Sequence, residues 1–233
     1  MLQDADKQWL ARRYPGLTTD GDGVRGAIEI DGTYHAESGQ FQNLADGGED
    51  TVGGLRLAGE FSIEIRARSD IAYSRLPALY VAGIEATADR HFSQQDKSAC
   101  LCSPLEEDDF LSPNFNFQKF LEQLVVPFLY GQLFHSKEAH WPWTEYAHGA
   151  TGILESYLRV RDPTKAQACL NKLALDVKNW PRIRSALKQR GPIKGHTPCF
   201  CGKMDFIRRC HPEAWKGIRN LHEHVTSQSI PIP

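Results

Sequence analysis

Several features that would quickly assign a chain to a class are missing from these 233 residues. No stretch approaches the roughly 18 consecutive apolar residues that a membrane-spanning helix needs. The first 16 residues are charged and amphipathic and contain no apolar signal core, so we expect a cytoplasmic protein without a membrane partner. There is also no internal repeat and no Gly-rich fingerprint for nucleotide phosphates. The sequence therefore offers no recognisable site for activating a substrate with ATP.

Charge is distributed unevenly along the chain. Residues 1–150 contain 12 Lys+Arg and 23 Asp+Glu, a net charge of −11, whereas residues 151–233 contain 15 and 6, a net charge of +9. A basic region can bind nucleic acid or an acidic protein, although interspersed Lys and Arg more often form a solvated helical face. Aromatic residues do not alternate with the basic ones in an RNA-binding pattern, so we do not expect a nucleic-acid partner.

The first half of the chain has the pattern of a helix followed by strands. At 41% hydrophobic residues the chain can bury a core, and its length fits one catalytic-sized domain with an appendage. Residues 4–13 suit a short helix. Apolar and polar residues alternate over 25–37, 61–67 and 76–82, which predicts antiparallel strands in a meander. The polar, Gly-rich residues 38–54 predict a long loop, and the whole predicts an α+β fold.

The second half is predicted to be mostly helical. After an irregular segment over 83–114, apolar residues at helical spacing over 115–134 predict a core helix that Pro127 kinks or divides. Further helices are expected at 148–160, 164–176 and 181–189. The second of these follows Asp162-Pro163, with Thr164 as its expected cap. Residues 190–198 have the composition of a linker.

The densest cluster of metal-binding residue types lies near the C-terminus. The chain has six cysteines, and without a signal segment we interpret them as thiols or metal ligands rather than disulfides. Four nitrogen or sulfur ligands fall within 13 residues, which matches the tetrahedral demand of structural Zn²⁺. They are Cys199, Cys201, Cys210 and His211. Because the protein fills all four positions, none remains for a catalytic water.

The residues around this cluster, TPCFCGKMDFIRRCHP, resemble the SEC-C family of zinc motifs. The resemblance covers residues 197–213 and implies a zinc-stabilised knuckle with a protein-binding or ribosome-binding role. We accordingly divide the chain into a catalytic domain, a helical linker, a zinc module and a tail. Their expected limits are 1–160, 161–195, 196–225 and 226–233.

A second cysteine motif lies in the irregular segment. His91 stands nine residues before Cys100, and the stretch from Asp96 to Leu101 is DKSACL. This pattern resembles the active-site segment of ubiquitin-conjugating enzymes, where a histidine-led turn precedes an Asp-Gly-Ser-x-Cys-Leu motif. The resemblance implies that Cys100 is the nucleophile that carries a protein as a thioester. It also implies that His91 braces the loop, and Asp96 is a candidate for orienting an incoming amine.

The expected order of elements, a helix, a meander, an irregular loop and then helices, is that of the ubiquitin-conjugating (UBC) fold. The stretch from Phe115 through Trp141-Pro142-Trp143 to Glu155 further resembles the bacterial branch of the family. That branch occurs in anti-phage systems (CBASS) built around a cyclic-nucleotide synthase, a cGAS-like nucleotidyltransferase. The implied partners are a protein carried by its C-terminus, either a ubiquitin-like protein or the synthase, and an acceptor lysine or other amine.

Two departures from the family pattern leave roles open. Phe92-Ser93 replaces the Pro-Asn after the histidine, so the asparagine credited with steadying the oxyanion is missing. Ser93, Gln94, His91 or a backbone N–H would have to replace it. Lys97 stands where the pattern has Gly. Because the pKa of a free cysteine is near ~8.5, reactivity at neutral pH needs a neighbour such as Lys97 or His91.

Other interpretations of the same residues stay open. Cys102 is the second choice of nucleophile, and Cys100 could instead be a small buried hydrophobe. Both could join Cys199 and Cys201 in a four-cysteine metal site, although the C-terminal set is complete without them. His148 is expected to be structural. The leading hypothesis is an acyltransferase of the UBC type; the rivals are an inert conjugating-fold adaptor that binds a partner through the zinc module and a nucleic-acid-associated protein.

Overall fold

The computed structural model describes residues 2–45, 47–68 and 74–233 of the chain. They form two compact units. The first contains a sheet and consists of the described residues up to Arg68 together with 75–102 and 109–145. The second is helical and consists mainly of 103–108 and 146–233. The protein is therefore α+β with an antiparallel sheet, as predicted.

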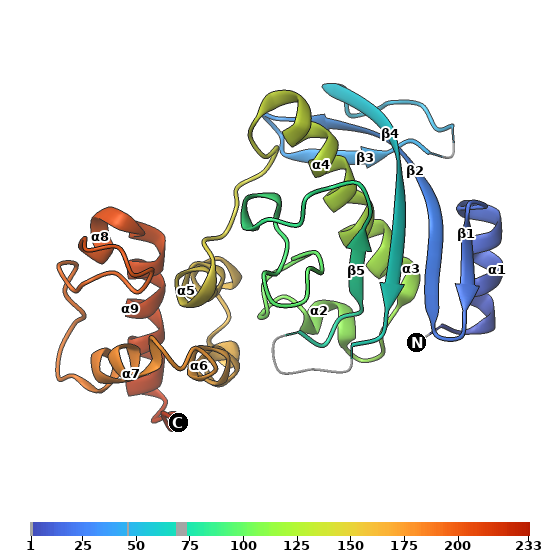
Figure 1. Ribbon diagram of the computed structural model, residues 1–233. Coiled ribbons are helices and arrows are strands. Elements are labelled where there is room, and N and C mark those ends of the chain that lie inside the picture. The colour runs from blue at the N-terminus through green and yellow to red at the C-terminus, as the bar shows by residue number, and fades with distance from the viewer. Residues whose placement is uncertain (1, 46, 69–73) are drawn as a thin grey trace. The chain divides into compact units, whose positions relative to one another are not determined.

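The first unit is built on a five-stranded antiparallel sheet (Figure 1). Its strands are β1 (Leu17–Asp20), β2 (Gly23–His35), β3 (Gln40–Asn43), β4 (Leu55–Arg66) and β5 (Ala78–Val81). β4 pairs with β2 from Val24 opposite Ile65 to Tyr34 opposite Leu55. The other edge of β2 is shared by β1 at its start and β3 at its end. β5 pairs with β4, so the order is β1-β2-β4-β5.

The predicted loop over 38–54 is wrong in part, because it contains β3. Residues 40–43 pair one by one with residues 32–35 of β2. This short strand has a single apolar residue, Phe41, so no alternation reveals it. Asp46 of the predicted loop lies outside the described residues.

One face of the sheet is apolar and covered by a helix. Along β4 the side chains of Phe61, Ile63 and Ile65 are buried, and their neighbours in sequence are more exposed. Helix α4 (Val126–Glu138) lies across β2 and β4 (Figure 1). A Cβ at Gly59 of β4 would lie 2.8 Å from Leu133 of α4, so the glycine permits the close approach of this helix. Helix α1 (Asp4–Arg13), also predicted, packs on β1.

The predicted core helix over 115–134 forms in three pieces. They are α3 (Phe117–Phe120), a π-helical turn η2 (Leu121–Val125) and α4. Pro127 lies in the first turn of α4, directly after the π turn. Since a proline has no N–H to donate, the wider turn before it lets the helix continue past the break. In the segment predicted to be irregular, two short helical turns occur: η1 (Ala88–Arg90) and α2 (Asp108–Leu111).

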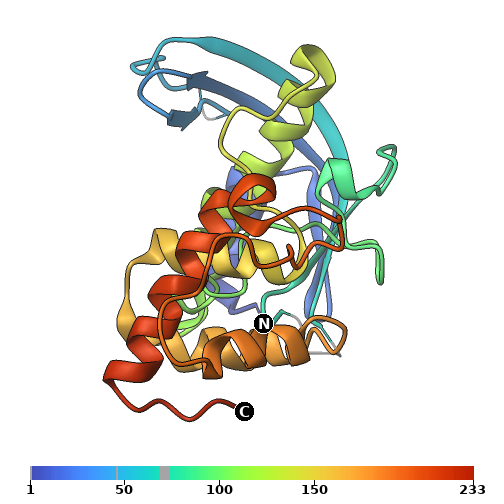
Figure 2. The same ribbon diagram turned by 90° about the vertical axis from the view of Figure 1, so that its left-hand side faces the viewer.

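The second unit is a bundle of helices around its own core (Figure 2). Its elements are α5 (Gly149–Val160), η3 (Pro163–Lys165), α6 (Ala166–Ala174), α7 (Trp180–Lys188), α8 (Ile207–Cys210) and α9 (Pro212–Ser227). The long helix α9 packs on α5. A Cβ at Gly217 would lie 2.0 Å from the Leu154 carbonyl oxygen, so only glycine allows the two helices to meet this closely.

Two details in this unit differ from the sequence-based expectations. Thr164, the expected cap, lies inside the turn η3 that precedes α6, and η3 is capped by Asp162, whose carboxylate accepts a hydrogen bond from the Thr164 N–H at 2.9 Å. The structure also divides the chain between Glu145 and Tyr146, since α5 packs with the second unit. The predicted first domain extended to residue 160.

Candidate functional sites

Residues 91–100 form a tight loop that presents Cys100. Phe92 and Ala99 form an isolated antiparallel bridge, and the Cys100 N–H donates to the His91 carbonyl at 2.7 Å. The Ala99 N–H donates to the Leu79 carbonyl of β5 at 2.8 Å. Both bridge residues are buried. The loop is therefore anchored to the sheet edge, and Cys100 follows directly after its last buried residue.

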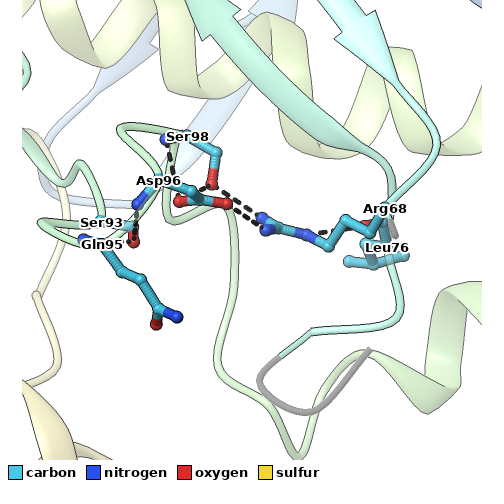
Figure 3. Close-up of polar contacts among 6 residues, drawn as sticks. All are labelled: Arg68, Leu76, Ser93, Gln95, Asp96 and Ser98. Atoms are coloured by element: carbon cyan, nitrogen blue, oxygen red, sulfur yellow. Dashed lines mark hydrogen bonds and ion pairs between the residues drawn. The ribbon is translucent and has the colours of Figure 1, made fainter. Parts of the chain in front are cut away.

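Inside the loop, Asp96 and Ser98 bind a cation from just beyond β4 (Figure 3). Arg68 donates from Nη1 to Asp96 Oδ2 at 2.6 Å and from Nη2 to Ser98 Oγ at 2.8 Å. Its Nε donates to the Leu76 carbonyl at 3.1 Å. Burial disfavours the charged carboxylate, but hydrogen bonds from Ser93, Ser98 and Arg68 outweigh it and lower the pKa of Asp96 to about 2. Asp96 is thus ionised at neutral pH and engaged within the loop.

His91 begins this loop in the left-handed region, with φ of 56°. Its Nε2 lies 2.8 Å from Glu145 Oε1, and its ring centroid lies 4.6 Å from that of Trp141. The Trp141 indole N–H donates to the Asp89 carbonyl at 3.2 Å. The imidazole is therefore fixed between a carboxylate and an aromatic ring, each from a segment that follows α4.

Cys100 is exposed, although surrounding atoms partly desolvate its sulfur. This desolvation raises the pKa of the Cys100 thiol; the positive charge of Arg68 opposes the rise and the negative charge of Asp96 adds to it. Lys97 Nζ, which the sequence suggested as an activating neighbour, donates instead to Gln94 Oε1 at 3.0 Å. The loop thus leaves the Cys100 residue exposed and favours the neutral, protonated form of its thiol.

The side chains considered for oxyanion stabilisation already make contacts within the loop. Ser93 Oγ accepts from the N–H groups of Gln95 and Asp96 at 3.2 and 3.4 Å. Gln94 Nε2 donates to two backbone carbonyls, at 3.1 and 3.3 Å. These groups maintain the shape of the loop.

The remaining candidates lie in different settings. Cys102 is half-buried and packs against the core of the first unit. His148 is the N-cap residue of α5, and its carbonyl accepts from Thr151 Oγ1 at 2.9 Å. Cys169 is fully buried in the core of the second unit.

The four predicted metal ligands, Cys199, Cys201, Cys210 and His211, come together in the second unit. Their ligand atoms all lie within 4.8 Å of one another. Cys199 Sγ lies 3.2 Å from His211 Nδ1, and Cys201 Sγ lies 3.5 Å from Cys210 Sγ. Two sulfurs bound at ~2.3 Å to one tetrahedral ion would be about 3.8 Å apart, which is close to these separations. This Cys₃His cluster could hold a metal ion without Cys100 or Cys102.

Local structure explains why these ligands converge. Pro198 and Phe206 form an antiparallel bridge, and Gly202 takes a φ of 87° in the turn between them, which few other residues tolerate. The short helix α8 then carries Cys210, and His211 lies between α8 and α9. Burial raises the pKa of Cys199 to about 12. For Cys201, burial is outweighed by hydrogen bonds from the Lys203 N–H and neighbouring thiols, which lower its pKa.

Sequence reasoning missed Arg68 and Glu145. They lie 28 and 54 residues from their partners Asp96 and His91. Local periodicity carries no signal for contacts over such distances. The only hints are an arginine directly after a predicted strand and a carboxylate beside the Trp141-Pro142-Trp143 corner.

No protein-family model, curated protein or solved structure matches this chain. In the part of the chain that the structure describes, no helix combines the length and apolar character needed to cross a bilayer. The two cysteine sites are therefore the basis for assigning a function.

Proposed function

We propose that the protein is a UBC-like acyltransferase in which Cys100 accepts the C-terminal acyl group of a protein and passes it to an amine. The observation that carries this proposal is the exposure of Cys100. This residue ends the loop, and the two residues before it, Ser98 and Ala99, are buried. An exposed cysteine on an anchored backbone can meet the flexible C-terminus of a large partner without unfolding of the loop.

The proposed reaction consists of two acyl transfers. In the first, the Cys100 thiolate attacks the carbonyl carbon of a donor that is already activated as a thioester or acyl adenylate, and the donor's leaving group departs. In the second, an amine attacks the same carbon, the C–N bond forms, the amine loses a proton and Cys100 leaves as a thiolate that is reprotonated. Because the sequence contains no ATP-binding fingerprint, the donor has to arrive activated.

The raised pKa of Cys100 suits a carrier of acyl groups. A thiol of high pKa is a poor leaving group, so its thioester with a protein resists attack by water for longer. The same thiol is ionised only to a small extent at neutral pH and attacks slowly. Binding of the donor protein offsets this, because it holds the carbonyl beside the sulfur at a high effective concentration.

In this scheme the loop contacts position Cys100. The ion pair of Arg68 with Asp96 closes the loop, and the contact of His91 with Glu145 fixes the first residue of the loop. We assign these side chains a positioning role. The engagement of the Asp96 carboxylate by Arg68 and Ser98 favours this role over direct contact with the incoming amine.

The order of elements supports the UBC-like assignment. An opening helix, an antiparallel sheet, an irregular loop with the cysteine and then the long run α3-η2-α4 follow one another as in the family that the Cys100 motif resembles. On that resemblance we propose a ubiquitin-like protein or a cGAS-like nucleotidyltransferase as donor, a lysine or other amine as acceptor, and a place in bacterial anti-phage defence.

The Cys₃His cluster is proposed to bind a structural zinc ion. Three sulfurs and one imidazole nitrogen are the donor set that tetrahedral Zn²⁺ prefers. Bound zinc would fasten the turn around Gly202 to the start of α9. The resemblance to the SEC-C motif further suggests that this module docks a protein partner.

A non-reducing gel tests the acyl transfer. The protein is incubated with ATP and the proteins encoded by its neighbouring genes, which serve as candidate donors and activating enzymes. We expect an adduct that thiol reagents remove, that Cys100→Ala abolishes and that Cys100→Ser converts to a thiol-resistant ester. Cys169→Ala is the matched control, since this buried cysteine lies in the other unit. An adduct that survives Cys100→Ala and disappears in Cys102→Ala would assign the reaction to the other sulfur.

An inert adaptor is the second candidate function. It is favoured by the raised pKa of Cys100 and by the engagement of Ser93 and Gln94 in loop contacts. An adaptor would bind the donor protein equally well with Cys100→Ala and would form no covalent adduct. Affinity measured with and without this substitution, beside the gel, separates the two functions.

A further inference from the structure

Two of the points at which the chain passes between the units adjoin the Cys100 loop and its contacts. The first unit includes residues 75–102 and 109–145, and the second includes 103–108 and 146–233. The chain therefore leaves the first unit directly after Cys102, and again directly after Glu145, which contacts His91. Because three residues span at most about 10 Å, Ser103 of the second unit lies within this distance of Cys100.

The segment that continues from the Cys100 loop is held firmly within the second unit. Ser103 is buried, and its hydroxyl shares a hydrogen bond with that of Ser156 in α5, which is also buried. Leu105 is 1% exposed and belongs to the core of this unit. The Leu105 carbonyl accepts a hydrogen bond from Lys165 Nζ at 2.7 Å. The second unit thus fixes the backbone that begins three residues after Cys100.

Glu106 joins the two passages within the second unit. Its Oε2 accepts a hydrogen bond from the Ser103 N–H at 3.0 Å, and its Oε1 accepts one from the Tyr146 hydroxyl at 2.7 Å. Ser103 is the first residue after one passage, and Tyr146 is the first after the other. The guanidinium of Arg159 lies 4.4 Å from the centroid of the Tyr146 ring and supports it. We call the two hydrogen bonds that Glu106 accepts the Glu106 bridge.

His91 joins the same two passages within the first unit. Its carbonyl accepts a hydrogen bond from the Cys100 N–H at 2.7 Å, and its Nε2 lies 2.8 Å from Glu145 Oε1. Together with the Glu106 bridge, these contacts close a ring that begins and ends at Cys100 and passes from unit to unit through peptide bonds. Loss of the bridge would therefore release the backbone that follows Cys100 from part of its support.

We propose that Glu106 is a positioning residue for Cys100, through which the second unit holds the nucleophile loop in place for acyl transfer. This inference rests on the proposed function of Cys100. A carboxylate suits the role because its two oxygens can accept two hydrogen bonds at once. Glu106 is half-buried, and partial exclusion of water strengthens both bonds.

Amide hydrogen exchange of the full-length protein, followed by NMR without any donor, tests this proposal. Glu106→Ala should speed exchange of the Cys100 N–H about ten-fold, because loss of the bridge makes local opening of the loop easier. Glu106→Gln should keep the rate within about two-fold of wild type, since its amide can accept from Ser103 and donate to Tyr146. Tyr146→Phe should speed exchange about three-fold and add nothing to Glu106→Ala, because both remove the same bond.

Asp162→Ala is the matched control for the exchange measurement. It removes another carboxylate of the second unit that accepts two hydrogen bonds, both from Thr164. It should change the exchange of the Cys100 N–H by less than about two-fold. Equal acceleration in Asp162→Ala and Glu106→Ala would indicate a general loosening of the second unit and overturn the proposal. An unchanged rate in Glu106→Ala would overturn it as well.

The effect of Glu106 on position is separable from an effect on charge. The charged groups that shift the pKa of Cys100 are Arg68 and Asp96, so Glu106→Ala should leave the midpoint pH of Cys100 alkylation unchanged. A midpoint that moves in Glu106→Ala would show that the carboxylate acts through its charge and would overturn the positioning role.

The gel assay separates this proposal from the proposed function. At saturating concentrations of the proteins in that assay, Glu106→Ala should form the Cys100 adduct about ten-fold more slowly, and Glu106→Gln should form it at the wild-type rate. A wild-type rate of adduct formation in Glu106→Ala would overturn the positioning role. A missing adduct in the unsubstituted protein, beside the expected exchange pattern, would refute acyl transfer while supporting the Glu106 bridge.

Discussion

Cys100 in the first unit and Cys199 in the second both lie on irregular segments, but their surroundings differ. Cys199 is buried, and three further nitrogen or sulfur ligands lie within 4.8 Å of it and of one another. Cys100 is exposed, and the charged groups that influence it are the guanidinium of Arg68 and the carboxylate of Asp96. Cys199 is therefore surrounded by other metal-ligand residues, whereas Cys100 is open to an incoming molecule.

The difference between the two surroundings shows how cysteine can serve two purposes in one chain, as a metal ligand and as a nucleophile. A turn that brings soft ligands together stabilises a metal ion, which in return stabilises the turn. A loop that is anchored by backbone hydrogen bonds and by Arg68 needs no metal to hold its shape. Its cysteine is therefore available for a covalent bond with a partner.

The largest expected effect comes from removing metal ligands. The variant Cys199→Ser/Cys201→Ser should lose the metal ion and destabilise the second unit by about 4 kcal/mol, the contribution of a ligand present at about 1,000 times its Kd. Metal analysis and urea unfolding measure the two losses. Cys100→Ala should keep the full metal content. Unchanged zinc in the double variant would contradict the proposed ligand set.

A smaller effect is expected for the anchor of the Cys100 loop. The pKa of Asp96 is lowered to about 2 in the folded protein from an ordinary 3.8, so its stabilising effect is complete above this ordinary value and is lost as the pH falls toward 2. Because the carboxylate is partly exposed, we expect Asp96→Asn to cost only about 1 kcal/mol at neutral pH.

Urea unfolding of Asp96→Asn across the acidic pH range measures the loss of stability, which should vanish at a pH of about 2. Glu29→Gln, at an exposed residue of β2, serves as the control for removing one carboxylate and should change the stability at neutral pH by less than about 0.5 kcal/mol. A cost for Asp96→Asn that stays constant with pH would show that the ion pair with Arg68 does not anchor the loop.

The smallest expected effect is on the ionisation of Cys100 itself. Alkylation of Cys100 followed by peptide mass spectrometry should show a midpoint pH above that of an ordinary cysteine, because desolvation raises its pKa. Since Arg68 lowers this pKa and Asp96 raises it, Arg68→Met should move the midpoint up and Asp96→Asn should move it down. Lys97→Met should leave the midpoint pH of Cys100 alkylation unchanged. A shift of the same sign in both variants would contradict the described electrostatics.

Much of the fold was predictable because strong local patterns carry it. The alternation over 61–67 identified β4, and the helical spacing of apolar residues over 115–134 identified the run that ends in α4. β3 was missed because it is short and has a single apolar residue, Phe41, so its sequence shows no alternation. The π turn before Pro127 was missed for a related reason, as its residues are as apolar as those of an ordinary core helix.

The two sites differ in how far the sequence determined them. The metal ligands lie within 13 residues, so their spacing was enough to predict that they converge. The neighbours of Cys100 come from distant segments, with Arg68 beyond β4 and Glu145 beyond α4. The direction of the Cys100 pKa shift depends on these neighbours and on burial, so it could not be predicted from the residues around Cys100 alone.

The most direct test of the account is to locate the acyl group by mass spectrometry. The protein is incubated with an activated donor, digested under non-reducing conditions at mildly acidic pH, and the peptide containing Cys100 and Cys102 is fragmented. We predict that the mass of the donor's C-terminal peptide lies on the sulfur of Cys100 and is released by hydroxylamine. A donor that binds the intact protein while both sulfurs stay unmodified would contradict acyl transfer and leave an adaptor.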